Sequence, residues 1–105
     1  MIADRSIEKK DYPNDIKVTV NPMDIVNDSS INIVIELLGG VELPYKIITE
    51  SIKNKKHVIT ANKALIAEHG DEIFRLAREN NVYFGFEASV AGAIPIISAL
   101  MTVSY

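Results

Sequence analysis

Three short stretches of the sequence carry residues whose types and spacing could do chemistry. They read ELLGG (36–40), TANK (60–63) and EASVAGAIP (87–95), and each closes or directly follows a run typical of a β-strand. Gly39 and Gly40 allow the backbone to turn tightly or to approach a ligand closely. Asn62 suits a helix cap, which puts Lys63 in a first helical turn. A cation is unfavourable there unless an anion or a substrate oxygen lies nearby.

Each of these residues also has a purely structural interpretation. The glycine pair can form an ordinary strand-to-helix turn, and Lys63 can be a solvated surface lysine. Glu87 is expected at a strand end beneath aromatic residues, where its charge needs either a ligand or hydrogen bonds from neighbouring backbone N–H groups. His57 and His69 have neither the spacing nor the context of a zinc site.

The elements that must position these stretches alternate between strand and helix. After a charged loop over 5–15, predicted strands cover 16–20, 31–38, 57–60 and 82–86, and the chain opens on the end of another at 2–4. Predicted helices cover 22–27, begin at Pro44, run from Lys63 to Asn80, and follow Pro95 as an apolar helix. Continuous apolarity over 31–38 predicts a strand buried on both faces.

This order predicts an α/β fold, a parallel sheet with helices on both faces. In such sheets ligands bind beyond the carboxyl ends of the strands, so the three stretches should meet at one edge. Their convergence is stronger evidence for a site than any single motif. No G-x-G-x-x-G pattern is present in the chain.

The composition favours one domain over residues 1–105 and excludes several partners. A hydrophobic content of 48% can form a core, while the net charge of −3 argues against nucleic acid or an anionic membrane as partner. The absence of cysteine excludes disulfides and thiolate chemistry. No run approaches the roughly 18 apolar residues of a membrane span, and the first residues lack the apolar core of a signal peptide, so a cytoplasmic domain is expected.

Long stretches of the sequence resemble the NAD(P)-binding domain of homoserine dehydrogenases. The resemblance is carried by ELLGG (36–40), HVITANKALIAEHG (57–70) and FEASVAGAIPII (86–97), and it runs from about Ile31 to Leu100. Residues 1–30 match only in layout. The resemblance implies a partial Rossmann-like fold that lacks the first strand and the glycine-rich loop. The chain is therefore expected to be a fragment of the enzyme, inactive by itself.

The resemblance also implies roles for individual residues. Lys63 is expected to be catalytic, beside the nicotinamide and the substrate. The expected cofactor-binding residues are Leu38, Gly39, Gly40, Thr60, Ala61, Asn62 and Lys63, with Arg5 near the adenosine ribose. A monovalent cation, sodium or potassium, is expected to bind Glu87, Val90, Gly92 and Ile94. Ala93 departs from the family, which commonly has a glycine there.

Two functions from different classes remain open at this stage. The resemblance implies an oxidoreductase that interconverts L-homoserine and L-aspartate 4-semialdehyde with NAD or NADP, in the cytoplasm, for threonine and methionine biosynthesis. Its partners are then a small-molecule substrate and further copies of the chain in a homo-oligomer. The alternative is a stand-alone small α/β domain that binds a ligand or a partner without catalysis.

Overall fold

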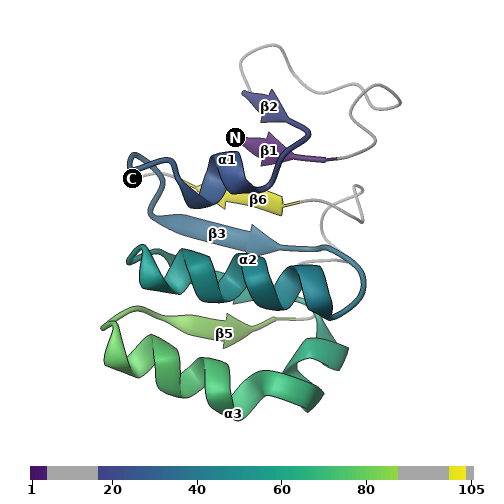
Figure 1. The fold of residues 1–105 in the computed structure, drawn as a ribbon, viewed down its shortest axis with the longest axis vertical. Helices are drawn as coiled ribbons and strands as arrows, with labels where there is room; N and C mark the ends of the chain where they lie inside the picture. Colours follow the sequence, from purple (N-terminus) through teal and green to yellow (C-terminus); the bar gives the residue numbers. More distant parts are fainter. Residues whose placement is uncertain (5–16, 88–99, 104–105) are drawn as a thin grey trace.

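The computed structural model describes residues 1–4, 17–87 and, for the backbone alone, 100–103 (Figure 1). Its elements are β1 (Ile2–Ala3), β2 (Val18–Thr19), α1 (Met23–Val26), β3 (Ile33–Glu36), α2 (Glu42–Lys53), β4 (His57–Thr60), α3 (Lys63–Glu79), β5 (Phe84–Phe86) and β6 (Leu100–Val103). The predicted alternation of strand and helix is confirmed from β2 to β5.

The strands form one sheet in the order β2-β1-β6-β3-β4-β5. The pairs β1–β2, β3–β4 and β4–β5 are parallel, as predicted. In the β3–β4 pair, Ile33 lies opposite His57 and Glu36 lies opposite Thr60. This register brings the carboxyl ends of the two strands level, so the segments that follow them begin side by side.

The three helices form a single layer on one face of the sheet (Figure 1). Side chains alternate along a strand, so β3 turns Val34 and Glu36 toward that layer, and both are fully buried. Ile33 and Ile35 point to the opposite face and are only half-buried. The prediction that this strand is buried on both faces is therefore wrong. Helices on both faces were also predicted, but every helix in the described part of the chain covers the same face.

Helices α2 and α3 supply most of the apolar contacts to the sheet. Ile48 and Ile52, one turn apart, are buried in α2, and Leu65 and Ile73 are buried in α3. Helix α2 begins two residues before the predicted start at Pro44. The core consists of Ala3, Ile25, Val26, Ile31, Val34, Ile47, Ile48, Ile52, Val58, Leu65, Ile73, Ala77 and Phe84.

Local signals lie near the predicted ends of two helices. The N-cap of α1 is Pro22 and not Asn21 as predicted, although the side chain of Asn21 accepts a hydrogen bond from the N–H of Met23 at 3.0 Å. Helix α3 ends at Glu79, and Asn81 follows with a left-handed φ of 58°, a conformation that asparagine tolerates.

The end of the described chain differs from the prediction. An apolar helix was expected after Pro95, but Leu100–Val103 is a strand that runs antiparallel to both β1 and β3. The rest of that predicted helix lies outside the described residues. Without β6, the facing edges of β1 and β3 would leave backbone N–H and C=O groups unpaired. Because Thr102 and Val103 are β-branched and suit a strand, this apolar segment can satisfy those groups.

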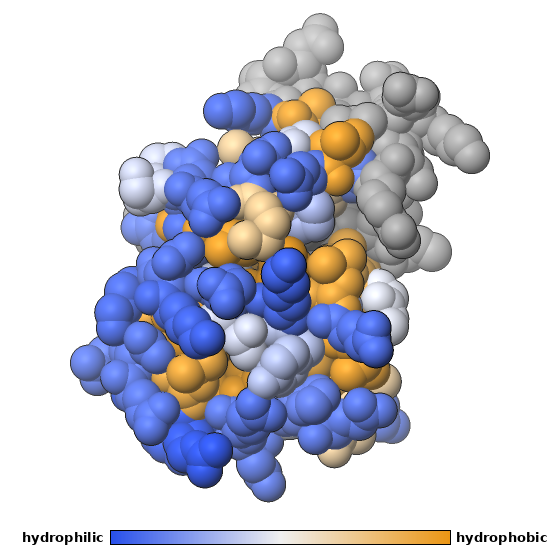
Figure 2. Space-filling view, viewed as in Figure 1, coloured by the Kyte–Doolittle hydropathy of each residue, from blue (hydrophilic) through white to orange (hydrophobic). Residues whose placement is uncertain are grey.

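Figure 2 shows the helix-bearing face, where polar residues cover most of the surface and apolar residues appear between them. This is the amphipathic pattern that a single helix layer over a sheet requires. Within the part of the chain that the structure describes, no helix is long and apolar enough to cross a membrane.

Candidate nucleotide site

The carboxyl ends of β3, β4 and β5 bring two of the predicted stretches, and Glu87 of the third, to one edge of the sheet. The N–H of Ala61 donates to the backbone oxygen of Glu36 at 3.3 Å, and the N–H of Glu87 donates to that of Thr60 at 2.9 Å. We call residues 38–40 the glycine loop and residues 60–63 the lysine loop. The predicted convergence is confirmed for these two loops and for Glu87.

The glycine loop contains one backbone conformation that requires glycine. Gly40 has a φ of +83°, a left-handed value that residues with a Cβ rarely adopt. Open space surrounds Gly39 and Gly40, because a Cβ added at either position would meet no heavy atom within 4 Å. The requirement at Gly40 therefore comes from its backbone angle and not from crowding. Gly39 and Gly40 are exposed to solvent, as a ligand-facing turn would be.

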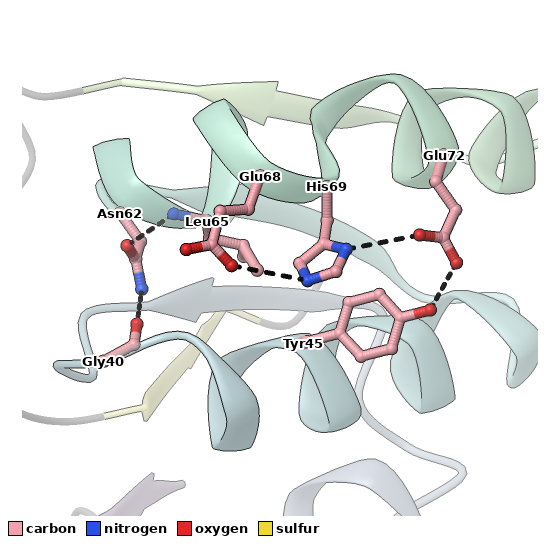
Figure 3. A network of polar contacts seen from close by, with 7 residues as sticks. All are labelled: Gly40, Tyr45, Asn62, Leu65, Glu68, His69 and Glu72. Carbon is pink, nitrogen blue, oxygen red and sulfur yellow. Dashed lines mark hydrogen bonds and ion pairs between the residues drawn. The ribbon is translucent and has the colours of Figure 1, made fainter.

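Asn62 connects the lysine loop to the glycine loop (Figure 3). Its Oδ1 accepts from the N–H of Leu65 at 3.0 Å, which confirms the predicted helix cap on α3. Its Nδ2 donates to the backbone oxygen of Gly40 at 2.7 Å and to that of Leu38 at 3.4 Å. One amide side chain thus caps the helix and holds the turn that precedes α2.

Glu36 lies beneath both loops with its side chain fully buried. Its Oε1 accepts from the hydroxyl of Thr60 at 2.5 Å, and its Oε2 accepts from the N–H of Leu38 at 2.6 Å. Burial raises the pKa of Glu36, and hydrogen bonds from Thr60, Leu38 and Asn62 oppose that rise. A buried carboxyl group at the end of two strands therefore links the loops from below.

Lys63 is the first residue of α3, and its side chain is exposed at the same edge of the sheet. Ala61, two residues earlier in the lysine loop, is half-buried. The helix N-terminus carries a partial positive charge from its unpaired N–H groups, so Lys63 adds to a positive potential at this edge. Such a potential attracts an anionic or polarised ligand.

Glu87 is exposed, so the prediction that it is buried beneath aromatic residues is wrong. The cause is that β5 is the outermost strand of the sheet, next to β4. Helix α3 covers Phe84, whose ring centroid lies 4.9 Å from that of Phe74, but Phe86 is 41% exposed and Glu87 follows it. Arg5, Val90, Gly92 and Ile94 lie outside the described residues.

Glu36 is a buried acid at this edge that the sequence reasoning did not single out. The sequence does indicate that Glu36 faces the core, since it is two residues after Val34 and therefore on the same side of the strand. An acid on the core-facing side of a buried strand must have hydrogen-bond donors. In the residues described, every buried side-chain nitrogen and oxygen has a partner.

The two histidines, which the sequence analysis did not predict to bind zinc, contact neighbouring residues. His57 accepts from the N–H of Tyr83 through Nδ1 at 3.0 Å. His69 lies against the ring of Tyr45, at 4.4 Å between centroids, and its Nδ1 is 3.4 Å from Glu72 (Figure 3). A hydrogen bond from Tyr45 lowers the pKa of Glu72. The described side chains include no group of three or more His, Cys, Asp or Glu that could hold a metal ion.

The fold and the site together define a class of protein. Parallel strands joined by helices, with a glycine turn and a positively charged helix N-terminus at their carboxyl ends, are typical of a Rossmann-like nucleotide-binding domain. Comparison with known proteins gives a narrower assignment. The family model described as "Homoserine dehydrogenase, NAD binding domain" matches residues 1–87. The chain belongs to the homoserine dehydrogenase family, within its NAD-binding domain.

Relatives and solved structures agree with the family. The homoserine dehydrogenase of Pseudomonas aeruginosa is 49% identical over 83 residues, which is 79% of this chain and 19% of that protein. A crystal structure of the Thiobacillus denitrificans homoserine dehydrogenase has a TM-score of 0.77 and 42% identity, over 83% of this chain and 20% of that chain.

A hyperthermophilic archaeal homoserine dehydrogenase in complex with NADPH has a TM-score of 0.60 and 27% identity, over 73% of this chain and 24% of that one. The chain thus spans about a fifth of the length of the proteins that it matches. The family match disfavours the alternative of a stand-alone binding domain unrelated to a dehydrogenase.

Proposed function

We propose that this chain forms the nicotinamide-binding edge of a homoserine dehydrogenase that interconverts L-homoserine and L-aspartate 4-semialdehyde. The observation that carries the proposal is the juxtaposition of the glycine loop and the lysine loop, in a chain that belongs to this family. The substrate is a small molecule. Synthesis of threonine and methionine, a cytoplasmic location and a homo-oligomeric enzyme belong to the same proposal.

The coenzyme in this proposal is NAD or NADP, whose reduced form would supply the hydride to the semialdehyde and whose oxidised form would accept it from homoserine. The backbone around Leu38, Gly39 and Gly40, with Thr60, Ala61 and Asn62, would line the nicotinamide ribose side of the site. The two loops suit this role because Gly39 and Gly40 are exposed and Asn62 joins the glycine loop to the lysine loop at 2.7 Å. Arg5 would lie near the adenosine ribose, where an arginine can meet a 2′-phosphate.

The role proposed for Lys63 is electrostatic. During reduction of the semialdehyde, negative charge grows on the carbonyl oxygen. A fixed ammonium group stabilises that charge more in the transition state than in the ground state. Lys63 suits this role because it is exposed at the start of α3, beside the glycine loop that Asn62 holds.

A monovalent cation, sodium or potassium, is proposed at EASVAGAIP. Glu87 would contribute its carboxylate, and Val90, Gly92 and Ile94 would contribute backbone oxygens, the hard ligands that such ions prefer. Because Glu87 is exposed, its charge does not need a cation to compensate for burial, so that argument for the site no longer applies. The support that remains is the resemblance of the motif and the place of Glu87 beside Thr60.

A chimeric enzyme tests the proposed function. This chain would replace the homologous residues of the Pseudomonas aeruginosa dehydrogenase, and NADPH-dependent reduction of aspartate semialdehyde would be measured. Lys63→Ala should lower kcat by about a hundredfold or more, the cost of removing one transition-state donor, and spare coenzyme binding. The matched control is Lys53→Ala, an exposed lysine in the last turn of α2. Near-normal turnover of the Lys63→Ala chimera would reject this role.

A further inference from the structure

Glu36 is a fully buried acid at the base of the proposed site, and the proposed chemistry leaves it without a role. Its two carboxyl oxygens divide between the two loops. One accepts from the N–H of Leu38 in the glycine loop, and the other from the hydroxyl of Thr60 in the lysine loop. The two donor–acceptor distances are 2.6 Å and 2.5 Å.

The contacts continue from Glu36 to the functional end of each loop. The hydroxyl oxygen of Thr60 also accepts from the N–H of Asn62 at 3.0 Å. Asn62 in turn holds the backbone oxygen of Gly40 and caps α3, whose first residue is Lys63. A closed path of hydrogen bonds therefore fixes the turn at Gly40 and the start of α3 relative to the same buried carboxylate.

We propose that Glu36 is a positioning residue for hydride transfer, because it clamps the glycine loop and the lysine loop at one separation. The proposal rests on the proposed function of these loops. Glu36 touches neither coenzyme nor substrate in this account, since it has no exposed surface. It acts by holding Lys63 and the backbone of the glycine loop in the arrangement that the reaction needs.

The chemistry of the side chain explains why an acid is required. An ionised carboxylate offers only acceptors, at both oxygens, and so can receive two donors at once. Glutamine offers one acceptor and one NH₂ donor, so its oxygen can keep the bond from Leu38, while its NH₂ group can only donate to the Thr60 hydroxyl oxygen, which already accepts from the N–H of Asn62. Glu36→Gln therefore preserves size, removes the charge and reverses the bond on the Thr60 side of the clamp.

The test uses the chimeric dehydrogenase, with Glu36→Gln as the main variant. A displacement of about 1 Å in an active site can cost about a hundredfold in rate, so kcat should fall about 10- to 100-fold. The dissociation constant for NADPH should change by less than the fall in kcat. Ser51→Ala is the matched control for a lost buried hydrogen bond, because the hydroxyl of Ser51 bonds within α2, to the Ile47 oxygen at 2.7 Å.

Hydrogen exchange provides a readout that does not depend on activity. Amides of the peptide that spans 36–40 should exchange faster in Glu36→Gln than in the parent chimera, because the Leu38 N–H loses a charged acceptor. The Ser51→Ala control should leave the exchange of that peptide unchanged. An unchanged kcat together with unchanged exchange in Glu36→Gln would overturn the proposal.

Two Thr60 variants keep the proposal testable if Glu36→Gln fails to fold. Thr60→Ser retains the hydroxyl and Thr60→Val removes it, so the serine variant should be the less impaired in kcat. Equal impairment would overturn the proposal. If the unsubstituted chimera does not reduce the semialdehyde, the proposed function fails and the catalytic part of this proposal fails with it. If the chimera is active and Glu36→Gln behaves as the parent does, the proposed role of Glu36 is wrong and the proposed function stands.

Discussion

The substitution Thr60→Val should destabilise this chain far more than a second buried Thr→Val substitution of equal size. The side chain of Thr60 is fully buried and takes part in two hydrogen bonds at once. It donates to Glu36 at 2.5 Å and accepts from the N–H of Asn62 at 3.0 Å. Valine has nearly the same shape but can make neither bond, so a buried carboxylate oxygen and a backbone N–H each lose a partner.

The expected magnitude follows from these two groups. Each buried group left without a partner costs about 1–3 kcal/mol, and the methyl group that replaces the hydroxyl returns about 1 kcal/mol. The net loss in the free energy of unfolding should be about 3 kcal/mol. For a domain of this size, a loss of that magnitude lowers Tm by about 10 °C or more.

Thr49→Val is the matched control. The hydroxyl of Thr49, in α2, donates to the backbone oxygens of Tyr45 and Lys46 at 2.8 and 3.2 Å. Carbonyl groups inside a helix already accept from N–H groups one turn later, so they keep a partner when the hydroxyl is lost. The control should cost less than about 1 kcal/mol. Urea unfolding followed by circular dichroism measures both variants, and an equal loss in the two would refute the reasoning.

The loss in Thr60→Val should also depend on pH. Burial raises the pKa of Glu36 above its ordinary value of 4.5, so folding favours the protonated acid. Stability from this group is therefore highest below about pH 4.5 and falls as the pH rises through the folded-state pKa. Thr60→Val removes a bond that lowers that pKa, so its deficit against wild type should be larger at pH 7 than at pH 4.

Three further predictions concern single residues. Gly40→Ala should cost about 1–2 kcal/mol of stability in urea unfolding, because its φ is +83°, whereas Gly39→Ala should cost less than half as much. Lys56→Met should cost about 2 kcal/mol of stability by the same assay, because the buried ammonium group of Lys56 donates to the backbone oxygens of Asp28 and Ile31 at 2.6 and 2.9 Å. The chimeric dehydrogenase should be more active in sodium or potassium than in tetramethylammonium salts at equal ionic strength. Glu87→Gln should weaken that preference, and a parent chimera with no preference would reject the cation site.

Patterns within short segments predicted much of this structure from the sequence. The strand His57–Thr60 has its predicted bounds, and the cap at Asn62 and the end of α3 before Asn80 agree with local signals. These features depend on residues within a few positions of one another, so the sequence alone contains the information. The convergence of the loops was predictable too, because parallel strands place their carboxyl ends at one edge.

Burial and strand order were decided only by the tertiary structure. Glu36 is the last residue of β3 and Glu87 directly follows β5, yet Glu36 is fully buried and Glu87 is exposed. The difference arises because β3 lies inside the sheet under the helix layer, whereas β5 forms its edge. Likewise, Leu100–Val103 is a strand and not a helix because β1 and β3 offer it two edges to pair with. The strands with which an apolar segment pairs can lie far away in the sequence. The intrinsic preference of the segment for helix or strand is weak enough that this pairing decides its conformation.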